Sequence, residues 1–120
     1  MKRVVGIVVG LGVVALAALL LIGGAAQTDD RNALYKSYEC VIYYDNAAAR
    51  LRNTGDRAGA EAATRRRDAW EEGLSAVFLT TDVPDDEIWA IEDRAYAEHR
   101  RQMAQGDWAA YEKRYARQCS

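Results

Sequence analysis

The first 26 residues decide how much of this chain is left to fold. A basic tripeptide, Met1-Lys2-Arg3, precedes an uninterrupted apolar run from Val4 to Ile22, which has 19 residues and no charged or polar side chain. A short basic end followed by an apolar stretch is the layout of a secretory signal. The remaining 94 residues, 27–120, are enough for one small domain with one core.

The fate of the apolar run has two interpretations. Gly24 and Ala26 provide the small side chains that a signal peptidase needs, which predicts cleavage before Gln27. The run is long for an excised signal, however, and almost long enough to span a bilayer as a retained helix. In both cases the basic leading end stays inside, so we expect residues 27–120 to be periplasmic or extracellular, either free or tethered to the membrane.

The charge of the exported part limits its partners. The whole chain carries −2, and setting aside Lys2 and Arg3 leaves about −4 for residues 27–120. Because nucleic acid repels a negative protein, it is an unlikely class of partner. We expect contact with a membrane only if residues 4–22 are retained.

Cys40 and Cys119, the only two cysteines, both lie in the exported part. An oxidising compartment lets disulfides persist, so an internal bridge between them is the default interpretation. An intermolecular bridge, or thiols that are free or bound to metal, are the alternatives. An internal bridge would connect the beginning of the domain to its end.

Capping residues and helix breakers divide the exported part into four predicted helices. Its one proline, Pro84, lies between helix-forming stretches, and Gly55 and Gly106 follow two others. Asp56 is expected to cap the second helix and Asp82 the third. The predicted helices cover about residues 30–53, 56–79, 83–105 and 108–119.

Each predicted helix has one apolar face at helical spacing. In the first, Leu34, Tyr38 and Val41 share a face, and Glu39 lies opposite. In the third, Ile88 and Ile91 begin the apolar face. Since short loops favour antiparallel neighbours, the sequence predicts an all-α fold, a small four-helix bundle stapled by one disulfide.

Four polar residues fall on or near the apolar faces. Asp45 and Arg67 are at similar heights on the first two helices, so we expect them to pair, while Glu92 and His99 are seven residues apart on the third. Buried charges require partners, which predicts a buried polar network of these four residues. A ligand or metal site made by Asp45, Glu92 and His99 is the alternative. No cofactor is expected.

Tyr43 lies opposite the centre of the first helix's apolar face. Tyrosine is enriched at protein interfaces, and this position makes Tyr43 a candidate for an exposed contact. Core packing accounts for the other tyrosines of this helix.

No motif in the chain specifies a chemistry. It has no phosphate loop, no Gly-x-Ser-x-Gly, no Cys-x-x-Cys and only one histidine. Three hypotheses follow: a non-enzymatic protein-binding module of the cell envelope, such as an inhibitor, immunity protein or stress chaperone; a membrane-anchored structural subunit; or an enzyme or metal carrier centred on His99. The first accounts best for the absence of motifs.

Overall fold

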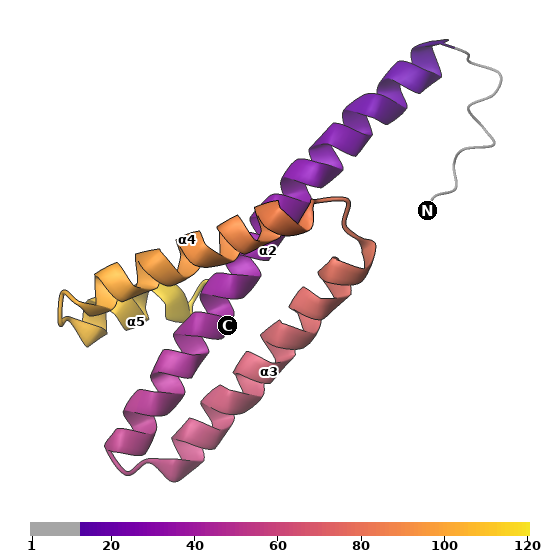
Figure 1. Ribbon diagram of the computed structural model, residues 1–120. Helices are drawn as coiled ribbons and strands as arrows, with labels where there is room; N and C mark the ends of the chain where they lie inside the picture. Colours follow the sequence, from indigo (N-terminus) through magenta and orange to yellow (C-terminus); the bar gives the residue numbers. More distant parts are fainter. Residues whose placement is uncertain (1–12) are drawn as a thin grey trace.

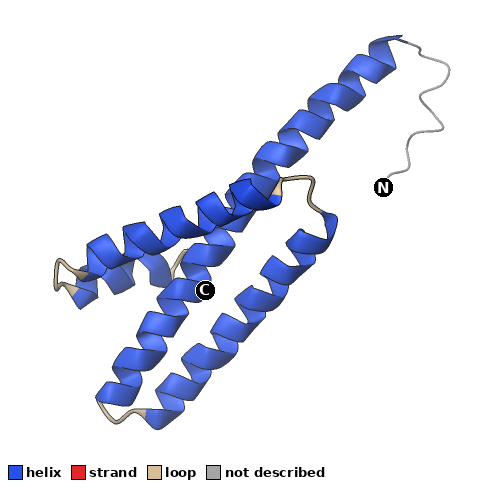
Figure 2. Ribbon diagram, in the orientation of Figure 1, coloured by secondary structure: helices blue, strands red, loops and turns tan. Residues whose placement is uncertain are grey.

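The computed structural model describes the backbone of residues 13–120 and the side chains of residues 29–120. The described backbone is helical with short connections and contains no strand (Figure 2). Its helices are α2 (Val13–Asn53), α3 (Arg57–Thr80), α4 (Asp85–Met103) and α5 (Trp108–Ala116). The predicted all-α fold, a small four-helix bundle, is confirmed.

Two of the turns have the chemistry expected from the sequence. Gly55 and Gly106 have φ values of 86° and 76°, a left-handed conformation that glycine adopts without strain. Asp56 and Asp107 follow them, and each side chain accepts a hydrogen bond from the backbone amide three residues later. Each carboxylate therefore satisfies an otherwise unpaired amide at the start of α3 or α5.

The loop between α3 and α4 differs from the prediction. Pro84, not Asp82, is the residue that precedes α4, and it has no side chain that can cap. Thr81 organises this loop instead, because its hydroxyl oxygen accepts from the amide of Val83 (3.2 Å) and its hydroxyl donates to Asp30 (2.8 Å). The loop is thereby tied to α2, which fixes where α4 begins.

Two helix ends also differ from the predicted bounds, the start of α2 and the end of α5. α2 begins at Val13, within the apolar run, and continues without a break past the predicted cleavage position at Gln27. Part of the predicted signal or anchor, residues 1–12, lies outside the described residues. Among the described residues, none of the helices combines the length and the hydrophobicity needed to cross a bilayer. α5 ends at Ala116, and the remaining residues turn back so that Cys119 reaches α2.

The central element is α2, against which the other helices pack (Figure 1). α3 runs antiparallel along one side of α2, and α4 crosses α2 on another. α5 folds back against α4 and α2. The Cys40–Cys119 disulfide joins the short segment after α5 to α2. Every residue from Ser37 to Tyr44 is buried, because several helices surround this part of α2.

The core has two parts. One is rich in aromatic rings and surrounds the disulfide, between α2 and α5; its buried members include Cys40, Tyr43, Tyr44, Tyr111, Tyr115 and Cys119. The other is mainly aliphatic, between α2, α4 and the end of α3; its members include Leu34, Tyr38, Ile42, Leu74, Ile88 and Ile91. α3 and α4 barely contact each other, so the bundle is open between them.

Candidate protein-binding groove

The predicted polar network divides into separate parts. Arg67 and Asp45 do meet, with Nη1 and Oδ1 3.3 Å apart, and Arg67 also contacts Asp68 at 2.8 Å. Asp45 is exposed and Arg67 is half-buried, so this is a surface pair and not a buried one. The expected contribution is about 0–1 kcal/mol, because solvent screens exposed charges.

His99 does not join the pair of Asp45 and Arg67; its polar neighbours are Tyr111 of α5 and Glu39 of α2. It is 1% exposed, and its ring packs against Tyr115 with the ring centres 4.3 Å apart. Asn46 donates a hydrogen bond to the Tyr111 hydroxyl (2.9 Å), and the same hydroxyl forms a hydrogen bond with His99 Nδ1 (2.7 Å).

The buried partner of His99 is Glu39, a residue that sequence reasoning placed on the outer side of the helix. Glu39 is 7% exposed, its carboxylate lies 3.4 Å from His99 Nε2, and it accepts a hydrogen bond from Gln118 (3.1 Å). Burial acts to raise the pKa of Glu39, but His99 and Gln118 together outweigh it, so the pKa is lowered. Its adjacency to Cys40 is the signal that could have placed Glu39 beside the last helix.

Tyr43 is not an exposed contact. It is 4% exposed and packs among Tyr44, Trp108, Tyr111 and Tyr115, with its ring stacked on that of Trp108. Burial raises the pKa of Tyr43 to about 12. The expectation assumed that α2 has one buried face, with Tyr43 on the opposite, exposed side. It was wrong because α5 covers that opposite side as well.

The alternative metal or ligand site does not form from the predicted residues. Asp45 and Glu92 face the open side of the bundle, while His99 has its nitrogens directed at Tyr111 and Glu39. Across the part of the chain with described side chains, no group of three His, Cys, Asp or Glu residues is arranged to hold a metal ion.

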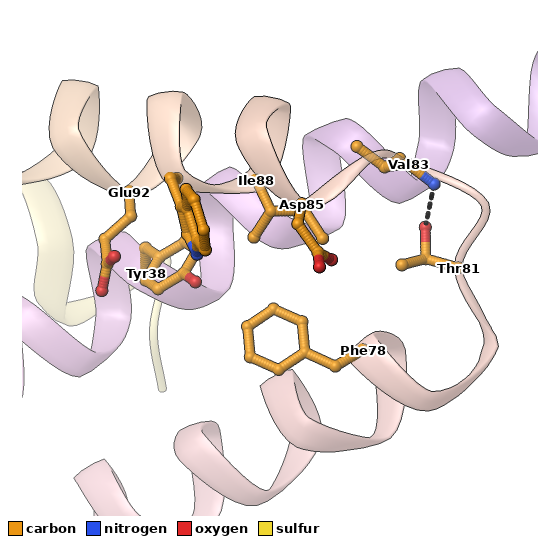
Figure 3. Close-up of a pocket in the computed structure, with 8 residues that line it drawn as sticks. Tyr38, Phe78, Thr81, Val83, Asp85, Ile88 and Glu92 are labelled. Carbon is orange, nitrogen blue, oxygen red and sulfur yellow. Dashed lines mark hydrogen bonds between the residues drawn. The ribbon is translucent and has the colours of Figure 1, made fainter.

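The open side of the bundle carries two hollows along α4, with α2 as their floor; α3 lines only the first, through Phe78. Figure 3 shows this first hollow, which has a volume of about 380 Å³ and where Tyr38, Phe78 and Ile88 meet. The second, of about 650 Å³, lies further along α4 and is lined by Ile42, Tyr96 and Met103 among others. We call the two hollows together the α3/α4 groove; its principal apolar residues are Tyr38, Ile42, Phe78, Trp89, Tyr96 and Met103.

Successive turns of the same two helices line the two hollows. On α4, Glu92 lines the first hollow and Tyr96, one turn later, lines the second; on α2, Tyr38 and Ile42 are related in the same way. The hollows therefore follow one another along α2 and α4. Burial and nearby carboxylates raise the pKa of Tyr96, and burial and Glu92 raise the pKa of Tyr38 to about 12.

The groove leaves large apolar side chains in contact with water. Trp89 is 64% exposed and Leu79, at the end of α3, is 86% exposed; Phe78, Tyr96 and Met103 are each more than a third exposed. Single exposed apolar residues are ordinary, but four of these five line the same groove. Such clustering is typical of a site where another molecule binds.

Two carboxylates lie within this apolar surface. Asp85 and Glu92 both line the first hollow; in Figure 3 the Asp85 carboxylate is directed toward the space above Phe78, whereas Glu92 lies at the other end of the hollow, beyond Tyr38. Neither makes an ion pair with any residue whose side chain the structure describes. Asp85 also suits the positive end of α4, whereas Glu92, two turns later, has no such role.

The arrangement of α4 explains how one helix serves both the core and the groove. Ile88, Ile91, Ala95 and His99 form its buried stripe at spacings of three, four and four. Beside this stripe, Trp89, Glu92, Tyr96 and Met103 form a second stripe that faces the groove. Sequence reasoning identified the first stripe and missed the second, whose signal is the aromatic pair Trp89 and Tyr96 at helical spacing.

Comparison with known proteins adds no relative from which a function could be carried over: no family, no curated protein and no solved structure matches the chain.

Proposed function

We propose that residues 27–120 form an exported, non-enzymatic domain that binds another protein of a bacterial-type cell envelope, as an inhibitor, immunity protein or stress chaperone does. The observation that carries the proposal is the α3/α4 groove, where Phe78, Trp89, Tyr96 and Met103 remain exposed together. Aromatic residues and methionine are enriched at the centres of protein interfaces.

Two features support an exported location. The basic tripeptide and apolar run at the start of the chain have the layout of a secretory signal. The Cys40–Cys119 disulfide, fully buried between α2 and α5, fits a compartment in which thiols are oxidised. Nucleic acid is not a partner in this proposal, because the domain is negatively charged.

Binding is favoured over catalysis by the position of the one histidine. His99 is 1% exposed, and its Nδ1 already bonds with Tyr111. A general base must reach the proton that it abstracts, and this ring faces the core instead. The polar groups around it join α2, α4 and α5, which is a structural role.

A membrane-anchored structural subunit is the second candidate, and the continuity of α2 favours it. The helix passes from Val13, within the apolar run, into the domain without a break. With the run retained, this helix would connect the membrane directly to the groove-bearing domain. Amino-terminal sequencing of the protein from its host separates the candidates: Gln27 as the first residue would exclude the anchored form, and Met1 would exclude the free form.

A quantitative pull-down from the envelope fraction tests the proposed binding. The full chain, a Trp89→Ser variant and a Glu112→Gln control variant on the exposed face of α5 are compared. We expect one or more envelope proteins to be captured by the wild type and the control, and to be depleted by at least about tenfold with Trp89→Ser, since a central aromatic residue carries much of an interface's affinity. Equal capture by all three proteins would contradict binding through the groove.

A further inference from the structure

The length and periodicity of the α3/α4 groove constrain what fits in it. From Trp89 to Met103 the groove-facing stripe of α4 extends about 21 Å, because an α-helix rises about 1.5 Å per residue. Its members, at spacings of three, four and seven residues, follow one line along α4. A further helix placed in this groove would meet the stripe along its whole length.

The walls of the groove favour a helix over an extended peptide. An extended peptide gains affinity by adding to a sheet edge, where free backbone groups accept and donate hydrogen bonds. Here the floor and both walls are helices, whose backbone groups are already paired within each helix. An α-helix satisfies its own backbone groups and presents only side chains to such a surface.

The charges in the groove specify the charged residues of the occupant. Asp85 and Glu92 lie in the first hollow without an ion-pair partner among the described side chains. In the second hollow Asp45 is paired with Arg67, whereas exposed Arg100 is not paired within the same described part. The groove is therefore negative at one end and has a free cation about 12 Å further along α4.

Resting on the proposed function, we infer that the α3/α4 groove binds one amphipathic α-helix of a partner protein, about four turns long. Its apolar face packs against Tyr38, Phe78 and Trp89, a lysine or arginine meets Glu92, and an acidic residue one heptad away meets Arg100. A hydrophobic groove that is read by residues at helical spacing is an established mode of peptide recognition.

A set of synthetic 16-residue helical peptides tests this inference by isothermal titration calorimetry with the purified full chain. Each peptide has leucine or phenylalanine along one face, with one lysine and one glutamate seven residues apart on that face. A scrambled peptide of the same composition and a peptide with the two charges exchanged are the controls. We expect the best amphipathic peptide to bind at least about tenfold more tightly than either control, since the controls lose the apolar face or place like charges together.

Variants of the protein locate the binding site. Glu92→Gln is expected to weaken binding of the lysine peptide by about fivefold, and Trp89→Ala by at least about tenfold, because the first removes one charge contact and the second an aromatic anchor. Glu112→Gln on α5 should leave the affinity unchanged. Circular dichroism and the absence of reactive thiols establish that each variant is folded.

Failure of the inference is distinct from failure of the proposed function. If no peptide binds more tightly than its scrambled counterpart, while envelope proteins are still captured in a manner that depends on Trp89, the helical occupant is wrong and protein binding stands. If phosphatidylglycerol vesicles, and none of the peptides, shift the fluorescence of wild-type protein but not of Trp89→Ala, the groove contacts lipid and the inference is overturned. If peptides bind and Trp89→Ala has no effect, the site lies elsewhere and the assignment to the groove is wrong.

Discussion

The two sides of α2 are built in opposite ways. On the side of α5, aromatic rings, a disulfide and hydrogen-bonded polar groups close the structure, and Tyr115, Cys40 and Cys119 are at most 1% exposed. On the side of the groove, Phe78 at the end of α3 and Trp89 and Tyr96 of α4 remain more than a third exposed. One side of the same helix thus holds the fold, and the other leaves apolar surface in contact with water.

Polar groups follow the same division. On the closed side, the Tyr44 hydroxyl and the Trp70 indole both donate to the carbonyl of Cys119, at 2.8 and 3.0 Å, and Gln102 donates to the Tyr115 hydroxyl at 2.8 Å. In the groove, the carboxylates of Asp85 and Glu92 face the hollow without a cation among the described residues. Because unpaired buried charge is costly, these carboxylates stay in contact with water in the free domain.

Removing the disulfide should have the largest effect on stability. The Cys40→Ala/Cys119→Ala double variant is expected to lose about 4.5 kcal/mol of unfolding free energy, because the bridge closes a loop of about 80 residues in the unfolded chain. Urea denaturation followed by circular dichroism measures the loss. In the wild type, a thiol assay on denatured, unreduced protein should detect no reactive cysteine; two reactive thiols would contradict the internal bridge.

A matched pair of tyrosine variants compares the two sides directly. Tyr111→Phe removes a buried hydroxyl that bonds with Asn46 and His99, and should cost about 1–3 kcal/mol because both partners lose their hydrogen bonds. Tyr38→Phe removes a hydroxyl at the floor of the groove and should change stability by less than about 0.5 kcal/mol. Equal losses from the two changes in urea denaturation would contradict the division into closed and open sides.

Helix positions, the cap at Asp56 and the disulfide pairing were predictable because they depend on local chemistry, whereas the cap assigned to Asp82 was wrong. Asp56 caps its helix as residue type and spacing indicated, and Cys40 meets Cys119. The buried polar pair of Glu39 and His99 was not predictable in the same way. Glu39 was assigned to the outer face of its helix, and this fails where α2 is covered on several sides.

The groove depends on a relation between helices that periodicity does not report. The sequence of α4 contains two adjacent stripes, and nothing in it says that Ile88 and Ile91 meet α2 while Trp89 and Tyr96 meet no helix. That distinction arises because α3 and α4 diverge from their common loop (Figure 1). The exposed aromatic residues beside α2 therefore include Trp89 and Tyr96 of α4 and not Tyr43.

The buried pair of Glu39 and His99 predicts a dependence of stability on pH. The pKa of Glu39 is lowered in the folded domain, so the unfolded chain takes up this proton first as the pH falls. The stabilisation is fully present above the ordinary pKa of a glutamate and is lost as the pH falls through the lower, folded value. Urea denaturation from neutral to acid pH should show a shallower decline for Glu39→Gln than for the wild type; parallel curves would exclude a contribution from Glu39.

Substitution within the groove should have the smallest effect on folding. Trp89→Ser is expected to change the unfolding free energy by less than about 0.5 kcal/mol, since this side chain is mostly exposed and leaves no cavity. The same change should reduce binding of the dye ANS, which reports exposed apolar surface. A loss of stability comparable to that of Tyr111→Phe would mean that Trp89 belongs to the core.

Site-specific photo-crosslinking in the envelope tests most directly whether the open side of α2 is where a partner docks. A photoreactive phenylalanine is placed at Trp89 in the groove and, as a matched control, at exposed Glu112 on α5. The account predicts a discrete protein adduct from position 89 that is absent from position 112. Adducts of the same size and yield from both positions, or an adduct from position 112 alone, would contradict it.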